Sequence, residues 1–139
     1  MQYPKPHHRT LEQANAFMAI IAGAWICAPG TALGTAEYDK LLRFLSEPSY
    51  GLLLILSGIF ANLAIYWNGN VHRSPWMRAC AASLISALWY LAAYSACLSG
   101  APSPTAVMFG GLWLIGAAGA WGAAREQSTR DNQEASNAV

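Results

Sequence analysis

Charged residues are scarce in this sequence: they make up only 11% of its 139 positions, against roughly 25% in an ordinary soluble domain. Apolar residues make up 55%, and a soluble fold of this length buries too small a share of its surface to hide them all. The net charge is +1 and the eight Lys and Arg are scattered, so the basic face of a nucleic-acid-binding protein is missing. The composition therefore predicts one domain embedded in lipid, with the bilayer as its partner and no nucleic acid.

Residues and motifs that carry catalysis or metal binding are also missing. The chain has three cysteines, none in a C-x-x-C pair, which excludes zinc ribbons and thioredoxin-type chemistry. No G-x-S-x-G, Gly-rich phosphate loop or H-E-x-x-H occurs. A metal site formed by His7, His8 and His72 is conceivable, but no carboxylate or cysteine lies at ligand spacing, so surface histidines are the favoured interpretation. We predict no enzyme, no catalytic residue, no metal site and no cofactor.

The chain does contain four long apolar runs, none with a Lys, Arg, Asp, Glu or His, at about 14–34, 50–67, 79–98 and 105–124. A membrane-spanning helix needs roughly 20 mainly apolar residues. The prediction is an all-α fold, an integral membrane four-helix bundle. Because pumps and ion-coupled carriers place ionisable groups inside the membrane, the uncharged runs argue against such a carrier.

Residues at the ends of the runs agree with helix boundaries. Pro75 and Pro104, each preceded by serine, suit the first position of the third and fourth helices. Gly69 suits the end of the second helix. Interfacial aromatic positions are expected for Tyr50, Trp67 and Trp76.

The segment between the first two runs predicts a short helix of its own. Over 35–46, Tyr38, Leu41, Leu42 and Leu45 recur at the i, i+3, i+4, i+7 spacing of one helix face. The favoured interpretation is an amphipathic helix in the membrane interface. The alternative is an ordinary loop helix packed on the protein.

Lys and Arg in short loops predict the orientation. One side would hold six of them and the other only Lys40 and Arg43; the six are Lys5, Arg9, Arg73, Arg78, Arg125 and Arg130. Both termini are therefore predicted in the cytoplasm, with 1–13 as a cytoplasmic tail and 125–139 as a disordered cytoplasmic tail. A competing interpretation makes 1–34 a cleaved signal peptide.

Small and polar residues in the runs predict how the helices meet. Small residues four apart let helix backbones approach closely in lipid, and Gly23, Gly58, Ser83, Gly116 and Gly119 are the candidate packing positions. This interface could lie within one bundle or between copies. The polar residues of the runs favour interhelical hydrogen bonds over a pore lining; they are Asn15, Ser57, Asn62, Ser83, Ser86 and Ser95.

Two further features leave alternatives open. In the loop 68–78, His72, Arg73 and Arg78 could contact anionic lipid headgroups, or their charges could only fix the topology. Cys27 and Cys97 fall near the outer ends of their runs. They could form a disulfide in an oxidising periplasm, but two small packed residues are the favoured interpretation.

Three stretches of this sequence are similar to stretches of known proteins. They are the stretch from Trp67 to Arg78 (WNGNVHRSPWMR), the Ala-rich run after it with Leu88-Trp89-Tyr90, and the Pro-led fourth run that ends in Ala-Ala-Arg-Glu126. They resemble small four-span membrane proteins of tailed bacteriophages and prophages, over about residues 50–126. The resemblance implies a bacterial inner-membrane protein with a non-enzymatic role in the host envelope, and carries no functional residues over.

Three functional hypotheses follow from this composition and resemblance. The leading one is assembly in the host membrane, in its sharpest form holin-like lesion formation by a homo-oligomer. The second is an accessory subunit of a larger membrane complex. The third and weakest is a small four-span transporter.

Overall fold

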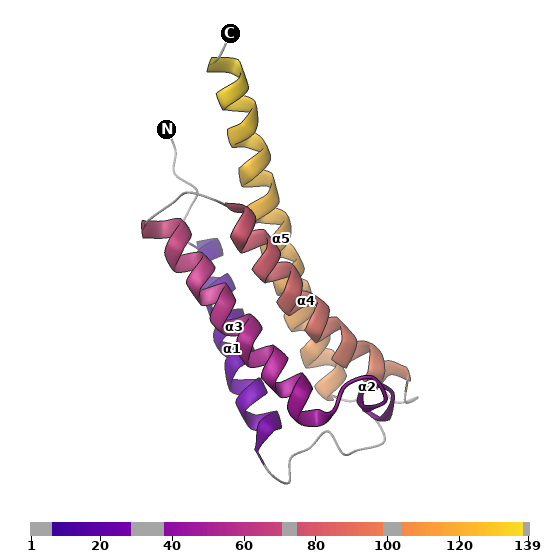
Figure 1. Ribbon diagram of the computed structural model, residues 1–139. Helices are drawn as coiled ribbons and strands as arrows, with labels where there is room; N and C mark the ends of the chain where they lie inside the picture. The colour runs from indigo at the N-terminus through magenta and orange to yellow at the C-terminus, as the bar shows by residue number, and fades with distance from the viewer. Residues whose placement is uncertain (1–6, 29–37, 71–74, 99–103, 138–139) are drawn as a thin grey trace.

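The computed structural model describes residues 7–28, 38–70, 75–98 and 104–137, and within them it is all-helical with no strand. Five helices follow one another along the chain: α1 (His7–Cys27), α2 (Asp39–Leu42), α3 (Glu47–Asn70), α4 (Pro75–Leu98) and α5 (Pro104–Asn137). The four long helices run along a common direction, and α5 extends well beyond the others (Figure 1). The start of α1 and the end of α5 lie at the same end of the bundle (Figure 1).

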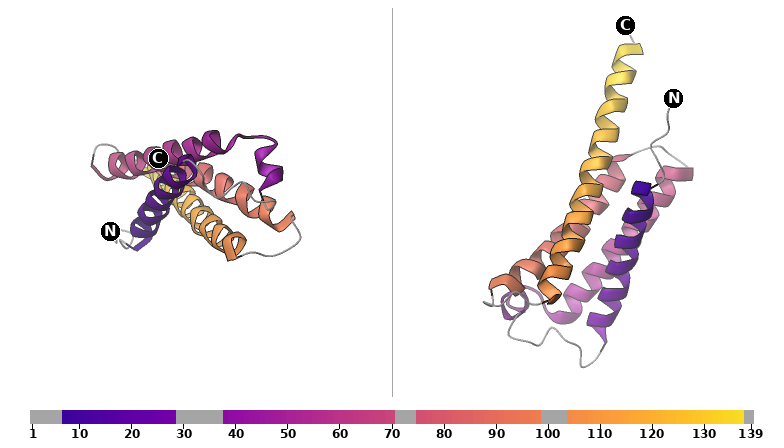
Figure 2. Two further views of the ribbon diagram at one scale, coloured as in Figure 1. Left: turned by 90° about the horizontal axis from the view of Figure 1, so that it is seen from below. Right: turned by 180° about the vertical axis from the view of Figure 1, so that it is seen from behind.

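The long helices pack as two antiparallel pairs. α1 packs mainly on α3, and α4 mainly on α5. The two pairs then meet through α3 with α4 and α1 with α5. Figure 2 shows the same arrangement from below and from behind, with α2 at the end opposite to the C-terminus of α5. We refer to these as the α1/α3 pair and the α4/α5 pair.

The α1/α3 pair is held together by glycines. A Cβ atom at Gly23 would lie 2.5 Å from the carbonyl oxygen of Gly51, and one at Gly58 would lie 2.6 Å from that of Ala16. Since no side chain stands between the helices at these points, the two backbones approach closely, which is how helices gain contact in lipid. Gly23 and Gly58 therefore pack within one chain, as one of the sequence interpretations expected.

Aromatic side chains fill the middle of the bundle. Trp89 and Tyr50 are its largest fully buried residues. The Trp89 ring stacks on Phe109 of α5 with 5.3 Å between the ring centroids. The expectation of an interfacial Tyr50 is wrong, because its ring is buried and its hydroxyl donates a 2.7 Å hydrogen bond to the Leu88 carbonyl.

The short helix α2 packs on the protein. Tyr38 and Leu41 are buried, and the half-buried Leu42 and Leu45 pack against the same core. The face expected to enter the membrane interface is therefore occupied by protein, which is the alternative interpretation of this segment. Phe44 is the large apolar residue of this segment that does not join the core, with 88% of its surface exposed.

The helix boundaries follow the sequence in part. Pro75 and Pro104 are the first residues of α4 and α5, as predicted. α3 continues through Asn70, so Gly69 does not end it. The two segments expected to be tails differ most from the prediction. α1 begins at His7, and α5 continues to Asn137 through the segment expected to be disordered. A bond from Gln127 Nε2 to Asp131 Oδ1 and one from Thr129 Oγ1 to the Arg125 carbonyl support the helix there.

Within the part of the chain that the structure describes, three helical segments are long and apolar enough to cross a membrane: Glu47–Trp67, Pro75–Leu98 and Ala106–Gln133. The expectation of an all-helical protein with membrane-compatible spans is thus confirmed for three of the four runs. The first expected span, 14–34, extends beyond the described part of α1, which ends at Cys27.

Candidate functional site

Three charged side chains from three helices meet at the end of the bundle where α3 ends and α4 begins. Arg78 of α4 donates from Nε to Glu12 Oε2 at 2.9 Å and from Nη2 to Glu12 Oε1 at 2.6 Å. Its Nη1 donates to Glu126 Oε2 of α5 at 3.1 Å. We call Arg78, Glu12 and Glu126 the Arg78 cluster. It ties α4 to both α1 and α5.

The Arg78 cluster is largely withdrawn from solvent. The side chains of Arg78, Glu12 and Glu126 are 5%, 9% and 20% exposed. A guanidinium that binds a carboxylate through two parallel N–H groups has both strength and a fixed geometry. In a low-dielectric setting each charge depends on the others, because a buried charge without its partner is strongly unfavourable.

This geometry changes the interpretation of Arg78. Its burial and its bonds to two carboxylates leave it little surface for a lipid headgroup, the contact expected from the sequence. His72 and Arg73, the other two expected headgroup contacts, lie outside the described residues. The side chains of His7, His8 and His72, considered above as metal ligands, also lie outside the described part of the structure.

Polar side chains of the apolar runs are used in hydrogen bonds. Trp89 Nε1 donates to Asn15 Oδ1 at 3.1 Å, which joins α4 to α1. The Leu41 backbone N–H donates to Ser95 Oγ at 3.2 Å, and Ser86 Oγ donates to the Trp113 carbonyl at 3.3 Å. Ser57 and Asn62 bond instead to carbonyls of their own helix. The bonds of Asn15, Ser86 and Ser95 agree with the favoured interpretation that such residues join helices, whereas those of Ser57 and Asn62 do not.

A cavity of about 20 Å³ lies next to the Arg78 cluster. Glu12, Asn15 and Arg78 contribute its polar wall, and the remainder is formed by small and apolar residues of α3, α4 and α5. A volume of about 10–15 Å³ with polar partners suffices for one water molecule. The cavity therefore joins the charged cluster to the first buried polar residue inside α1.

The predicted packing positions fall into two groups. Gly116 faces Ser86 and Asn15, and Gly119 faces Glu12, so an added Cβ would press on these side chains. With Gly23 and Gly58, these glycines lie at helix contacts within the chain. Ser83 does not: it is exposed on the wall of an open groove of about 620 Å³ between α4 and α5.

The cysteines are separate from this site. Cys27, Cys80 and Cys97 are all free thiols on exposed positions. Cys27 Sγ lies 3.7 Å from the Pro48 carbonyl of α3. The structure therefore contains no bond between Cys27 and Cys97, and because both residues are exposed it does not show the two buried packing residues of the favoured interpretation either.

The sequence analysis missed the Arg78 cluster. Glu12 and Glu126 fall in the two segments read as tails, and Arg78 is separated from them by 66 and 48 residues. One sequence signal could have indicated this cluster: residues of opposite charge flank different apolar runs on the same predicted side of the membrane. Comparison with known proteins adds no functional assignment, since no family model, curated protein or solved structure matches the chain.

Proposed function

We propose that this chain is a non-enzymatic integral protein of the bacterial inner membrane that acts by assembling with further copies of itself. All four long helices lie in the bilayer in this proposal. The first support comes from the surface, where large apolar side chains of every long helix are exposed: Ile21 on α1, Leu63 on α3, Leu84 on α4 and Leu114 on α5. In water such a surface would be an aggregation hazard, whereas in lipid it is the ordinary exterior.

The close contact between α1 and α3 argues for α1 as a fourth span. Because Gly23 meets Gly51 and Ala16 meets Gly58, α1 lies along α3 with no room between the backbones. The outward side of α1 carries Phe17, Ile21 and Trp25, all more than half exposed. These residues are four apart and form one apolar face. A helix fixed to a membrane span and apolar on its outer side belongs in the same bilayer.

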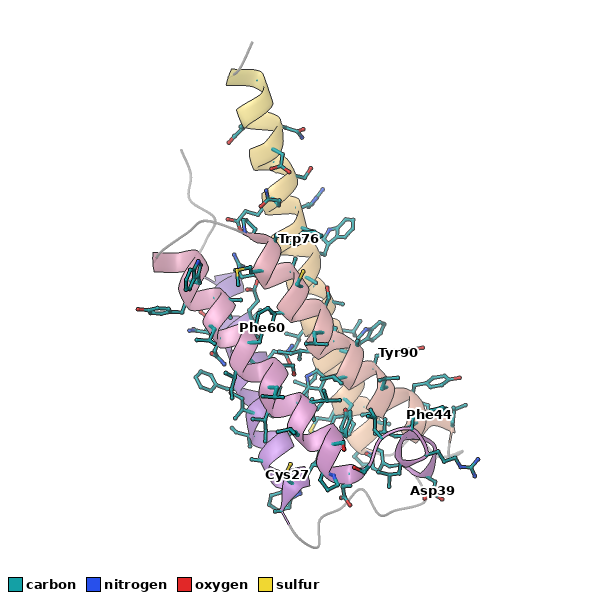
Figure 3. All side chains as sticks on the ribbon, in the orientation of Figure 1. Cys27, Asp39, Phe44, Phe60, Trp76 and Tyr90 are labelled. Carbon is teal, nitrogen blue, oxygen red and sulfur yellow. The ribbon has the colours of Figure 1, made fainter. Side chains whose placement is uncertain are left out.

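Exposed aromatic residues gather near both ends of the bundle. Trp67 and Trp76 lie at the end that carries the Arg78 cluster, while Trp25 and Tyr94 lie towards the other. Trp76 and Tyr94 are separated by about 27 Å along α4, at 1.5 Å per residue, close to the roughly 30 Å of a hydrocarbon core. In Figure 3, Trp76 lies at the upper end of α4 and Phe44 lies near its lower end. This spacing supports bilayer-crossing helices, with the Arg78 cluster near a headgroup boundary.

The outer face of α5 is the observation that carries the assembly part of the proposal. A Cβ atom at Gly111 or at Gly122 would meet no atom within 4 Å, so these glycines serve no contact inside the chain. With the exposed Ala118 they recur at i, i+7 and i+11 and fall on one line of the helix. Small residues aligned in this way let a second helix approach closely in lipid. α5 also has the least buried apolar window of the three candidate spans, at 22%.

Lesion formation is the sharpest form of this function, and it agrees with the resemblance to small phage membrane proteins. Expression in bacteria is expected to let a membrane-impermeant dye into the cells. Gly111→Leu with Gly122→Leu fills the small-residue line without disturbing the fold, and should abolish dye uptake and the homo-oligomer. The matched control is Ala24→Leu, an exposed small residue on α1, which should leave both unchanged. Intact membranes at high expression of the unaltered chain would refute the lesion.

An accessory role in a larger membrane complex is favoured by a different feature. The polar end of α5, from Gln127 to Asn137, projects beyond the other helices (Figure 2). A projecting helix is a surface that a foreign subunit could bind. Purification in mild detergent distinguishes the two roles, because a stoichiometric foreign subunit supports the accessory role and a homo-oligomer supports lesion formation.

A further inference from the structure

Two kinds of contact hold this bundle together, and they occur in different places. Inside the α1/α3 pair, the close contacts involve Gly23, Gly51 and Gly58. Between the α1/α3 pair with α2 on one side and the α4/α5 pair on the other, the contacts are rich in polar groups. We call this second interface the seam.

Four polar contacts between described residues cross the seam, and each of these four ends on α4. Arg78 binds Glu12, Trp89 Nε1 donates to Asn15, the Tyr50 hydroxyl donates to the Leu88 carbonyl, and the Leu41 N–H donates to Ser95. α4 therefore presents a series of polar partners to the first half of the chain.

These contacts extend along most of a bilayer. Arg78 and Ser95 lie near the two ends of α4, with Leu88 and Trp89 between them. At 1.5 Å per residue the distance from Arg78 to Ser95 along the helix is about 26 Å, compared with a hydrocarbon core of roughly 30 Å. The cavity of about 20 Å³ beside Glu12, Asn15 and Arg78 lies in the seam, at its charged end.

The free energy needed to separate the two helix pairs depends on whether lipid or water fills the space between them. If lipid filled it, four sets of polar groups would be left without partners in hydrocarbon, which costs several kcal/mol for each group. Water satisfies the same groups. The close contacts of Gly23, Gly51 and Gly58 inside the α1/α3 pair need not change when the pairs part.

We propose that the seam is a latent aqueous path across the membrane, which fills with water when the α1/α3 pair and the α4/α5 pair move apart. Its lining is Glu12, Arg78, Asn15, Tyr50 and Ser95, and its charged mouth is the Arg78 cluster. The inference rests on the proposed function, because it assigns the polar lining that a lesion requires, but its test needs no lesion.

Thiol accessibility in vesicles tests the path. In a variant whose three native cysteines are replaced by alanine, Ala61→Cys and Ala81→Cys place thiols on opposite walls of the seam cavity, at positions that are 5% and 1% exposed. A membrane-impermeant methanethiosulfonate reagent should modify both. Two controls should stay unmodified: Ala16→Cys, fully buried where α1 meets Gly58 of α3, and Ile21→Cys, on the apolar outer face. We expect the seam thiols to react at least about tenfold faster than either control, since thiol reactivity requires access to water.

A conservative variant links the labelling to separation of the pairs. Tyr50→Phe removes only the hydroxyl that bonds to Leu88 across the seam, and should accelerate labelling of Ala61→Cys by roughly two- to tenfold, the worth of one hydrogen bond. Tyr94→Phe, an exposed tyrosine, is the matched control and should change nothing.

The outcomes separate this inference from the proposed function. Seam labelling in vesicles without dye uptake in cells supports the path and refutes lesion formation. Dye uptake with seam thiols as unreactive as Ala16→Cys refutes the path and leaves lesion formation standing. The inference would also be overturned if the seam thiols were labelled but Tyr50→Phe did not accelerate their labelling. The labelling would then not arise from separation of the helix pairs at the seam.

Discussion

Arg78 and Glu12 form a two-point contact, with N–O distances of 2.6 and 2.9 Å, although 66 residues separate them in the chain. Both side chains are more than nine-tenths buried. The pair joins α1 to α4, and Glu126 of α5 binds the same guanidinium. In a buried pair of this geometry, each charge is stabilised by the other, so removing either residue leaves its partner without a counter-charge.

Removing the arginine should destabilise the bundle strongly. Arg78→Met leaves two carboxylates in a poorly hydrated site without their cation, at a cost of about 3–5 kcal/mol in the free energy of unfolding. Titration of the detergent-solubilised protein with a denaturing detergent, followed by circular dichroism, measures it. Arg78→Met combined with Glu12→Leu and Glu126→Leu removes all three charges and should recover most of the loss. Equal losses in the single and triple variants would contradict the assignment.

The two carboxylates should differ in importance. Glu12 accepts two hydrogen bonds from Arg78 and is 9% exposed, whereas Glu126 accepts one at 3.1 Å and is 20% exposed. Glu12→Gln should therefore lower the free energy of unfolding more than Glu126→Gln does, since solvent compensates for a lost partner at the more exposed position. The same unfolding measurement on the two variants decides the order, and the reverse order would speak against this geometry.

Filling the helix contact at Gly58 should separate α1 from α3. In Gly58→Ala the new methyl group lies 2.6 Å from the Ala16 carbonyl oxygen, and overpacking of this kind costs about 1–3 kcal/mol. Gly110→Ala is the matched control, because nothing lies within 4 Å of that position. It should leave stability unchanged or raise it by up to about 1 kcal/mol through helix propensity. Thermal unfolding of both variants provides the comparison.

The hydrogen bond between Asn15 and Trp89 should be measurable as a coupling energy. A double-mutant cycle with Asn15→Ala and Trp89→Phe isolates the interaction between the two positions. Interhelical hydrogen bonds in membrane proteins give about 0.6 kcal/mol on average and up to about 1.7, and the buried Trp89 Nε1 contact should lie within that range. A coupling energy of zero would mean that this bond does not join α1 to α4 in lipid.

All three cysteines should be found as thiols. Cys27, Cys80 and Cys97 are free and exposed in the structure. Protein isolated without reductant and unfolded in the presence of an alkylating reagent should gain three adducts by mass spectrometry. A chain with only one adduct and a linked pair would instead require α1 and α4 to meet at their outer ends.

Local signals in the sequence were enough to place several helix boundaries. Proline cannot donate a backbone hydrogen bond and its fixed φ suits the first turn, so Pro75 and Pro104 mark the starts of α4 and α5 wherever the rest of the chain lies. Gly23, Gly58, Gly116 and Gly119 were found for a similar reason, since an absent side chain in an apolar run points to a close contact. Ser83 satisfied the same pattern but faces outward, because spacing alone does not say which side of a helix meets a neighbour.

Long-range contacts were beyond the reach of local patterns. The Arg78 cluster depends on which helices become neighbours, and no spacing in the sequence encodes that. The same applies to the short helix α2: its apolar face was recognised, but whether protein or lipid would cover it depended on α4, against which it packs. The polar end of α5 was misread because helix-favouring side-chain bonds such as Gln127 to Asp131 are weak signals in a segment without an apolar face.

The concentration of polar partners on α4 has a consequence for how the protein is made. In the membrane arrangement proposed above, α1 to α3 leave the ribosome first, and they carry Glu12, Asn15 and Tyr50 into the bilayer before α4 exists to bind them. Until that helix arrives, the half-synthesised protein must keep these groups near water or near the insertion machinery. A chain that stops after Asn70 should therefore be a poor membrane protein and a substrate for quality-control proteases, even though its own two helices pack well.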